Sequence, residues 1–140
     1  MNRHKLKIII GLFIIVIIIS ILGINKYNKP HLDVRTSNVA FTYTPTKLIK
    51  EYQKNEGIAT KKLANKILQI EGDTYTISTL KGSSIITFNS EALASSVICH
   101  LQPQENTKIL NLKKNQYITI RGICTGYLLD VLVVECVLVN

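Results

Sequence analysis

The feature that most constrains this chain is an uncharged, isoleucine-rich run from Ile8 to Ile24. Its 17 residues include ten Ile, two Leu, one Phe and one Val. As a helix the run would extend about 25 Å, at about 1.5 Å per residue, which is near the lower limit for crossing a bilayer. It is apolar on every face, and a small domain cannot bury such a helix. The run therefore predicts a transmembrane helix over residues 8–24, after a basic flank over residues 1–7.

A cleaved signal peptide is the main alternative, and it requires small residues at a cleavage site. The run ends in Ser20-Ile21-Leu22-Gly23, where bulky side chains interrupt the small ones. We therefore expect an uncleaved anchor and a single-pass membrane protein, with the lipid bilayer as partner of residues 8–24. The basic residues on the two sides of the run nearly balance. Their slight excess on the N-terminal side favours a cytoplasmic N-terminus and an extracytoplasmic domain.

The net charge of +8 is divided unevenly along the chain. Residues 1–29 hold five Lys and Arg and no acid, whereas the remaining 12 Lys and Arg face all nine acids, which leaves +3. Basic residues that flank a membrane span commonly reach lipid phosphates. The high net charge is therefore a weak argument for a nucleic-acid partner.

The rest of the chain has room for one domain. Residues 25–37 are polar, contain Pro30 and show no period, so we expect a linker there and the domain over residues 38–140. Thr44-Pro45 predicts a helix start, because Thr is a favoured N-cap and Pro is tolerated at the first helical position. A second short helical segment is expected between Ile58 and Ala64.

After Lys66 the hydrophobic period changes to two, which is typical of strands. A phase shift at Gly72 predicts a first strand that is bent by a bulge. The expected strands are 66–80, 84–88, 96–101, 117–124 and 131–139, with a turn at Lys81-Gly82-Ser83, one helical turn within 107–112 and a hairpin over 126–130. This pattern predicts an all-β class with minor α content: a five-stranded OB-fold Greek-key barrel, preceded by a short helix and the transmembrane helix.

Several segments resemble the tRNA_anti-like (tRNA-anticodon-like) family of bacterial OB-fold proteins, many of which carry an N-terminal membrane segment. The segments are residues 27–31 (YNKPH), Asn55-Glu56, residues 66–72 (KILQIEG) and, most specifically, residues 118–131 (ITIRGICTGYLLDV), which are followed by Cys136. The resemblance implies the barrel fold. It implies no catalytic or ligand residues.

An OB barrel that binds single strands uses aromatic side chains for base stacking and Lys or Arg along a groove. The candidates are Phe88 and His100 on the middle strands, Tyr75 and Tyr117, and the basic pair Lys113 and Lys114. For the tyrosines, a place in the barrel core or at its rim is the alternative reading. For the lysines, it is a solvated surface.

The three cysteines form no C-x-x-C pair and are odd in number. A disulfide between Cys124 and Cys136 is one interpretation. The other is that Cys99, Cys124 and Cys136 are small buried hydrophobic residues on strands. The three histidines, at positions 4, 31 and 100, are scattered, and neither paired carboxylates nor a phosphate-binding loop is visible. We expect no metal, no cofactor and no enzymatic activity.

The sequence thus favours a membrane-anchored OB-fold binding or interaction module that faces the cell envelope. Its partner would be a protein, peptide or saccharide. A domain that binds single-stranded nucleic acid is the alternative, and we rank it second because the domain itself carries only +3.

Overall fold

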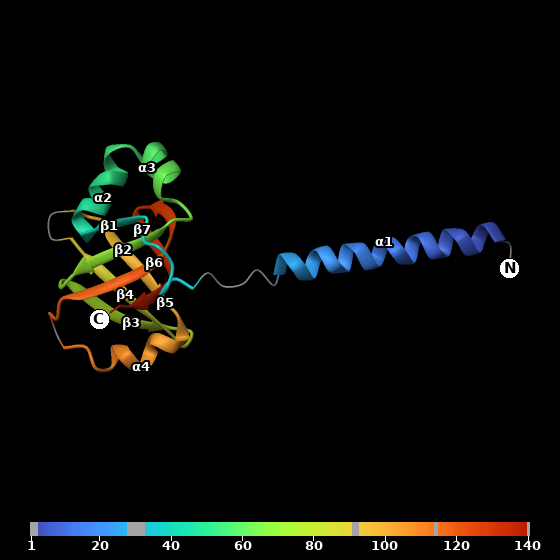
Figure 1. Cartoon of the computed structure of the whole chain (residues 1–140). Helices are drawn as coiled ribbons and strands as arrows, with labels where there is room; N and C mark the ends of the chain where they lie inside the picture. The colour runs from blue at the N-terminus through green and yellow to red at the C-terminus, as the bar shows by residue number, and fades with distance from the viewer. Residues whose placement is uncertain (1–2, 28–32, 91–92, 114, 140) are drawn as a thin grey trace. The chain divides into compact units, whose positions relative to one another are not determined.

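The computed structural model describes residues 3–27, 33–90, 93–113 and 115–139, and in its first helix it describes side chains from Ile10 to Gly23. The chain divides into two compact units, Met1–Leu32 and Asp33–Asn140. Helix α1 (Arg3–Tyr27) lies in the first unit (Figure 1). Its described large apolar side chains are exposed. Within the part of the chain that the structure describes, no helix is long and apolar enough to cross a membrane.

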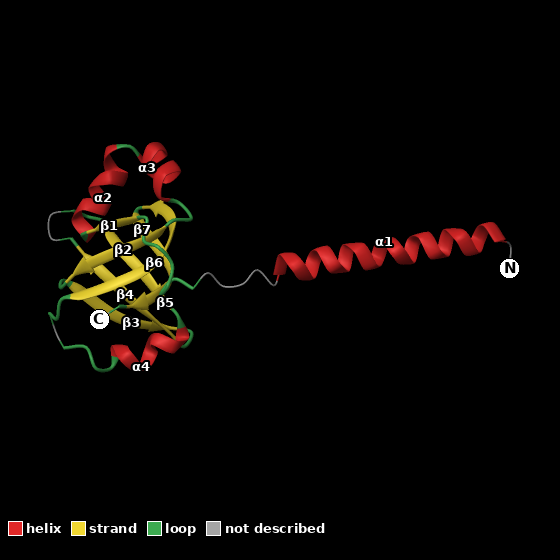
Figure 2. Ribbon diagram, viewed as in Figure 1, coloured by secondary structure: helices red, strands yellow, loops and turns green. Residues whose placement is uncertain are grey.

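The second unit is mostly β-sheet with a few short helices (Figure 2). Its strands are β1 (Phe41–Tyr43), β2 (Ile67–Gly72), β3 (Tyr75–Leu80), β4 (Ser83–Asn89), β5 (Ser96–Leu101), β6 (Ile118–Leu128) and β7 (Asp130–Leu138). They form one sheet in the order β1-β2-β6-β7-β5-β4-β3. Two neighbouring pairs are parallel, β1 with β2 and β5 with β7, and the others are antiparallel.

The sheet closes on itself through the first long strand. Strands β2 and β3 lie near opposite ends of the strand order but are separated in the chain only by Asp73 and Thr74. The break follows Gly72, where an added Cβ would lie 3.3 Å from the Phe88 ring. The two strands are therefore the halves of the single bent strand expected at this point, and the closed order is that of an OB-type barrel.

The structure has seven strands rather than the five predicted. One extra strand arises because the predicted strand 66–80 is divided into β2 and β3. The other is β1, which the sequence did not predict and which pairs in parallel with residues 68–70 of β2. The turn at Lys81-Gly82 and the boundaries of β5 agree with the prediction. Strands β6 and β7 form the predicted hairpin, but β6 continues to Leu128 and pairs there with Asp130, so the turn is shorter than the predicted 126–130.

Helices α2 (Pro45–Lys54) and α3 (Glu56–Leu63) lie between β1 and β2 in the chain, and η1 (Pro103–Glu105) with α4 (Asn106–Ile109) connects β5 to β6. Helix α2 begins at Pro45, as predicted, and buries Leu48, Ile49 and Tyr52 in the core. Asn55 caps α3, because its side-chain oxygen accepts a hydrogen bond from the Ile58 N–H at 3.0 Å. The buried face of α2 closes one end of the barrel.

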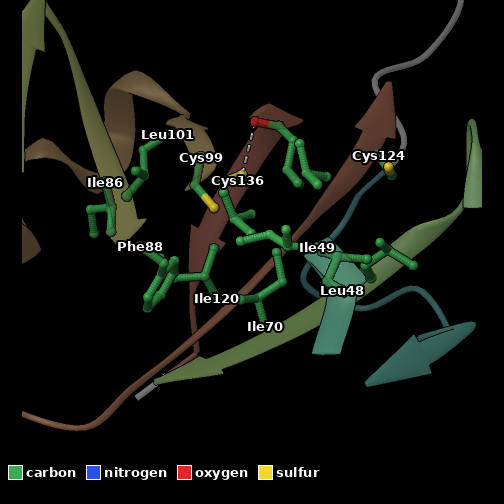
Figure 3. Close-up of a cluster of buried hydrophobic side chains, with 14 of the residues drawn as sticks. Leu48, Ile49, Ile70, Ile86, Phe88, Cys99, Leu101, Ile120, Cys124 and Cys136 are labelled. Atoms are coloured by element: carbon green, nitrogen blue, oxygen red, sulfur yellow. Dashed lines mark hydrogen bonds between the residues drawn. The ribbon is translucent and has the colours of Figure 1, made fainter. Parts of the chain in front are cut away.

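All three cysteines are free and buried, so the structure does not contain the disulfide considered between Cys124 and Cys136. Figure 3 shows Cys99 and Cys136 beside each other in the core, with Cys124 apart from them. The Cys136 thiol donates to the Val133 carbonyl at 3.5 Å, and the Cys124 sulfur lies 3.2 Å from the Tyr52 hydroxyl. Burial raises the pKa of the Cys124 and Cys136 thiols. The cysteines act as small core residues, the other reading of the sequence.

The compact unit begins at Asp33, whereas composition placed the start of the domain at residue 38. Val34 is fully buried and packs with Ile67 and Val137 outside the main core. Arg35 donates to the carboxylate of Glu105 and, at 3.3 Å, to the Leu138 carbonyl. This segment is therefore held against the barrel by both apolar and charged contacts.

Candidate functional site

The outer face of strands β4, β5 and β7 carries two adjoining grooves. Val97 and Cys99 of β5 point into the core, so the residues that follow each of them, Ile98 and His100, point outward. Thr87 of β4 pairs with Ile98, which in turn pairs with Leu132 of β7. The strand pairing thus places Thr87, Ile98 and Leu132 in a row across the middle of this face.

The first groove, here called the hairpin groove, has a volume of about 500 Å³. Helix α3, strand β5 and the β6–β7 hairpin form its walls. Its lining residues are Glu56, Thr60, Ile98, Thr125, Gly126, Tyr127, Leu128, Asp130 and Leu132.

The second groove, here called the strand groove, has a volume of about 410 Å³. It is lined by Ser83, His100, Leu101, Gln102, Pro103, Leu132, Val134 and Glu135. Leu132 belongs to both grooves, so they adjoin along β7. A ligand that lies along β7 could therefore contact both.

The charged groups in these two grooves are all acidic. Glu56 and Asp130 line the hairpin groove and Glu135 lines the strand groove, whereas among the described residues neither groove is lined by Lys or Arg. The domain as a whole is basic, so this face has the opposite charge to its surroundings. Phosphate groups would be repelled here, and a cationic ligand would be attracted.

Two of the groove residues are fixed by hydrogen bonds or ring contacts to the fold. The Asp130 carboxylate accepts from the Ser96 N–H at 2.6 Å, which ties the hairpin to β5. Tyr127 stacks on Tyr52 of α2, with ring centroids 5.3 Å apart and an angle of 15° between the rings. Burial, together with the Cys124 contact, raises the pKa of Tyr52. One face of the Tyr127 ring is thus covered, and the groove is preformed.

The structure separates the residues predicted to bind a ligand. Phe88 is fully buried and packs edge-to-face on Tyr75, with 5.9 Å between ring centroids. It points inward because it shares the strand phase of Ile86, so it offers no surface to a ligand. His100 lies on the outer face and lines the strand groove.

The other predicted residues lie elsewhere on the domain. Tyr75 and Lys113 line a groove of about 280 Å³ next to β3, where the Tyr75 hydroxyl donates to the Lys113 carbonyl at 3.4 Å. Burial raises the pKa of Tyr75. Tyr117 lines another groove, together with residues of α2 and β2, and its hydroxyl donates a hydrogen bond to the Glu71 carboxylate at 3.3 Å. Lys114 lies outside the described residues. The candidates thus do not form one site.

Sequence reasoning missed most of the two grooves, including Ile98, Leu128 and Leu132. A signal was present in Leu128-Leu129, two large apolar residues at a predicted hairpin, where polar turn residues are usual. In the described ranges, no group of three or more His, Cys, Asp or Glu side chains is placed to hold a metal ion. The aliphatic side chains and carboxylates of this face suit a ligand that is both apolar and cationic.

Comparison with known proteins identifies a family and a similar solved structure. The tRNA_anti-like family profile matches residues 1–138. The fold is similar to the crystal structure of a candidate nucleic acid-binding lipoprotein from Klebsiella pneumoniae subsp. pneumoniae MGH 78578, with a TM-score of 0.58 and 17% sequence identity, over 71% of this chain and 91% of the other. No curated protein matches the chain.

Proposed function

This chain belongs to the tRNA_anti-like family, and from that premise we propose that it is a membrane-attached binding module whose outer barrel face holds a polypeptide. The observation that carries the proposal is the pair of adjoining grooves on β5 and β7, which share Leu132. Their floor is aliphatic and their charged groups are carboxylates. Apolar contact with a few placed polar groups is typical of polypeptide recognition.

Membrane attachment is supported by the sequence of the N-terminal run. The uncharged stretch from Ile8 to Ile24 extends beyond the described side chains, which begin at Ile10 and end at Gly23. Fourteen large apolar residues at about −0.3 to −0.6 kcal/mol each favour insertion by roughly 4 to 8 kcal/mol. The module would then act close to a membrane surface, with its barrel on the extracytoplasmic side.

A pair of reporter fusions tests the proposed topology. Alkaline phosphatase fused after Asn140 should be active and membrane-bound, because the enzyme folds only when exported, whereas a cytosolic reporter at the same place should be inactive. A matched variant with Ile14→Lys and Ile17→Lys should release the fusion from the membrane fraction, since each charge costs about 3 kcal/mol at the centre of a span. Activity of the cytosolic reporter alone would show the opposite orientation.

Nucleic-acid binding is the second candidate, and the description of the Klebsiella protein favours it. Against it stand the three carboxylates of the grooves and the modest charge of the domain. We expect the chain to retain no labelled single-stranded oligonucleotide at physiological salt, as measured by filter binding over a salt series. Tight retention with a steep decrease in affinity as salt increases would replace the polypeptide proposal with this one.

A further inference from the structure

The tip of the β6–β7 hairpin carries two leucines that the barrel does not bury. Leu128 and Leu129 are 88% and 80% exposed. Leu129 also has a φ of +72°, a left-handed conformation that costs an L-residue about 1 to 2 kcal/mol and that Gly or Asn adopts more readily. The folded chain thus carries a backbone cost and two exposed leucines at one turn. Neither feature stabilises the barrel.

We propose that the hairpin groove, with Leu128 and Leu129 as its lip, docks an extended polypeptide segment that carries basic and apolar side chains in turn along one face. This inference rests on the proposed function and specifies the ligand for the same face. Its apolar side chains would contact the leucine lip and the floor at Ile98 and Leu132. Its basic side chains would face the two carboxylates of the groove.

Charge complementarity selects this occupant among those that apolar surfaces attract. Glu56 is exposed at the start of α3 and Asp130 lies at the start of β7, so the carboxylates come from two different walls of the groove. Among the described residues, no cation lines the groove to offset them. An anionic lipid surface or a nucleic acid would be repelled, whereas Lys or Arg side chains would be attracted.

The spacing of the groove residues fits an extended segment. Asp130, Leu132 and Val134 follow one another at every second position of β7, which corresponds to about 7 Å between successive outward side chains. An extended segment repeats its own side chains at the same interval. Side chains at every second position of the segment lie on one face, so basic and apolar residues that take turns at those positions could stay in register with the acidic and aliphatic residues along β7, from the hairpin groove towards the strand groove.

Fluorescence anisotropy with defined peptides tests the inference on the full chain in detergent micelles, with peptide and micelles alone as the blank. The probe is a labelled peptide that repeats lysine–serine–leucine–serine, which places lysine and leucine in turn on one face of an extended segment. In one comparison peptide glutamate replaces each lysine, and in the other serine replaces each leucine. We expect the lysine–leucine probe to bind at least about tenfold more tightly than either, because a single favourable contact of about 1.4 kcal/mol gives that factor. Equal binding of the two leucine-containing peptides would overturn the inference, since it would indicate unselective apolar adsorption.

Leu129→Asn removes the apolar side chain while Asn tolerates the left-handed turn. We expect it to weaken probe binding at least about fivefold and to leave the stability of the barrel unchanged or increased, so that lost binding cannot be attributed to unfolding. Glu56→Lys should weaken binding at least about tenfold by repulsion. The matched control is Leu110→Asn, which replaces a leucine that is 84% exposed and lines neither groove, and should leave binding unchanged.

A further variant separates failure of this inference from failure of the proposed function. Leu132→Ser alters the residue that both grooves share. If it abolishes probe binding while Leu129→Asn and Glu56→Lys have no effect, the outer face binds polypeptide but the hairpin groove is not the docking site. If none of the three variants matters, both proposals are wrong. Binding of anionic lipid vesicles that Leu129→Asn abolishes would assign the leucine lip to a membrane surface and overturn the inference.

Discussion

Replacing Gly122 with alanine is expected to destabilise the barrel by about 3 kcal/mol, the upper end of the usual cost of overpacking a core. A Cβ at this position would lie 2.5 Å from the Cys136 sulfur and 2.6 Å from Cγ1 of Val133, and 3.1 Å from the Val134 carbonyl oxygen. The β6–β7 register shifts at this point and Glu135 has a φ of +53°, so the β7 backbone bulges beside the glycine. Both strands would have to move to admit a methyl group.

Urea unfolding followed by circular dichroism measures this effect. The matched control is Gly57→Ala in α3, where the nearest atom to an added Cβ is Asn55 Oδ1 at 3.6 Å. Because alanine has a higher helix propensity than glycine, the control substitution should be neutral or should stabilise the chain by up to about 1 kcal/mol. The double variant Gly122→Ala with Cys136→Ala should recover part of the loss, because it removes the nearest of the three contacts. Equal midpoints for Gly122→Ala and the unmodified chain would contradict the packing that the structure describes.

The strands that could be predicted are those whose side chains alternate clearly. Strand β5 buries every second residue, and its predicted boundaries, 96–101, agree with the structure. Strands β6 and β7 are apolar on both phases because their outward residues also have contacts. Ile123 packs on the cluster of Val34 and Ile67, and Leu132 lines the grooves. A search for strict alternation of apolar and polar residues would therefore have predicted these two strands less well.

The rest of the fold depends on contacts between residues far apart in sequence. Strand β1 has only three residues, and its extended conformation depends on parallel pairing with residues 68–70. The hydrophobic period of the sequence cannot reveal a strand of only three residues. The candidate site was limited in the same way, since Glu56 and Leu132 come together only through barrel closure. Phe88 was assigned to the site by its chemistry, whereas its phase, shared with Ile86, places it in the core.

A buried carboxylate at position 105 shows the same dependence on distant partners. Glu105 lies in the short helical connection between β5 and β6 and is only 3% exposed. It accepts from the Leu138 N–H at 3.0 Å, from Lys108 at 3.2 Å and from Arg35. These partners belong to the end of β7, to α4 and to the segment before β1. One carboxylate therefore joins three parts of the unit that are far apart in the chain.

Glu105→Ala is expected to lower the free energy of unfolding by about 2 to 3 kcal/mol, the upper part of the range for a buried donor that loses its acceptor. The main cost is the Leu138 N–H, which is buried and would lose its acceptor. Arg35 and Lys108 have side chains that are 44% and 46% exposed, so water can solvate them again. Glu105→Gln keeps an oxygen acceptor for the Leu138 N–H and should cost only about 1 kcal/mol. Urea midpoints at pH 7 distinguish the two variants.

The pH dependence of unfolding tests the charge itself. Burial alone would raise the pKa of Glu105, but the hydrogen bonds from Leu138, Lys108 and Arg35 outweigh it and lower the pKa below its usual 4.5. A carboxyl whose pKa is lower in the folded state contributes stability at pH values above its unfolded pKa and loses this contribution as pH decreases through the folded pKa. Stability should therefore decrease between about pH 5 and the folded pKa, and less steeply in Glu105→Gln. Glu51→Gln, which removes an exposed ion pair with Lys62, is the matched control and should cost at most about 1 kcal/mol. If Glu105→Gln and the unmodified chain instead lost stability equally steeply as pH decreases, that result would assign the acid dependence to other carboxylates. The Glu105 network would then stabilise the fold without a contribution from the charge of Glu105.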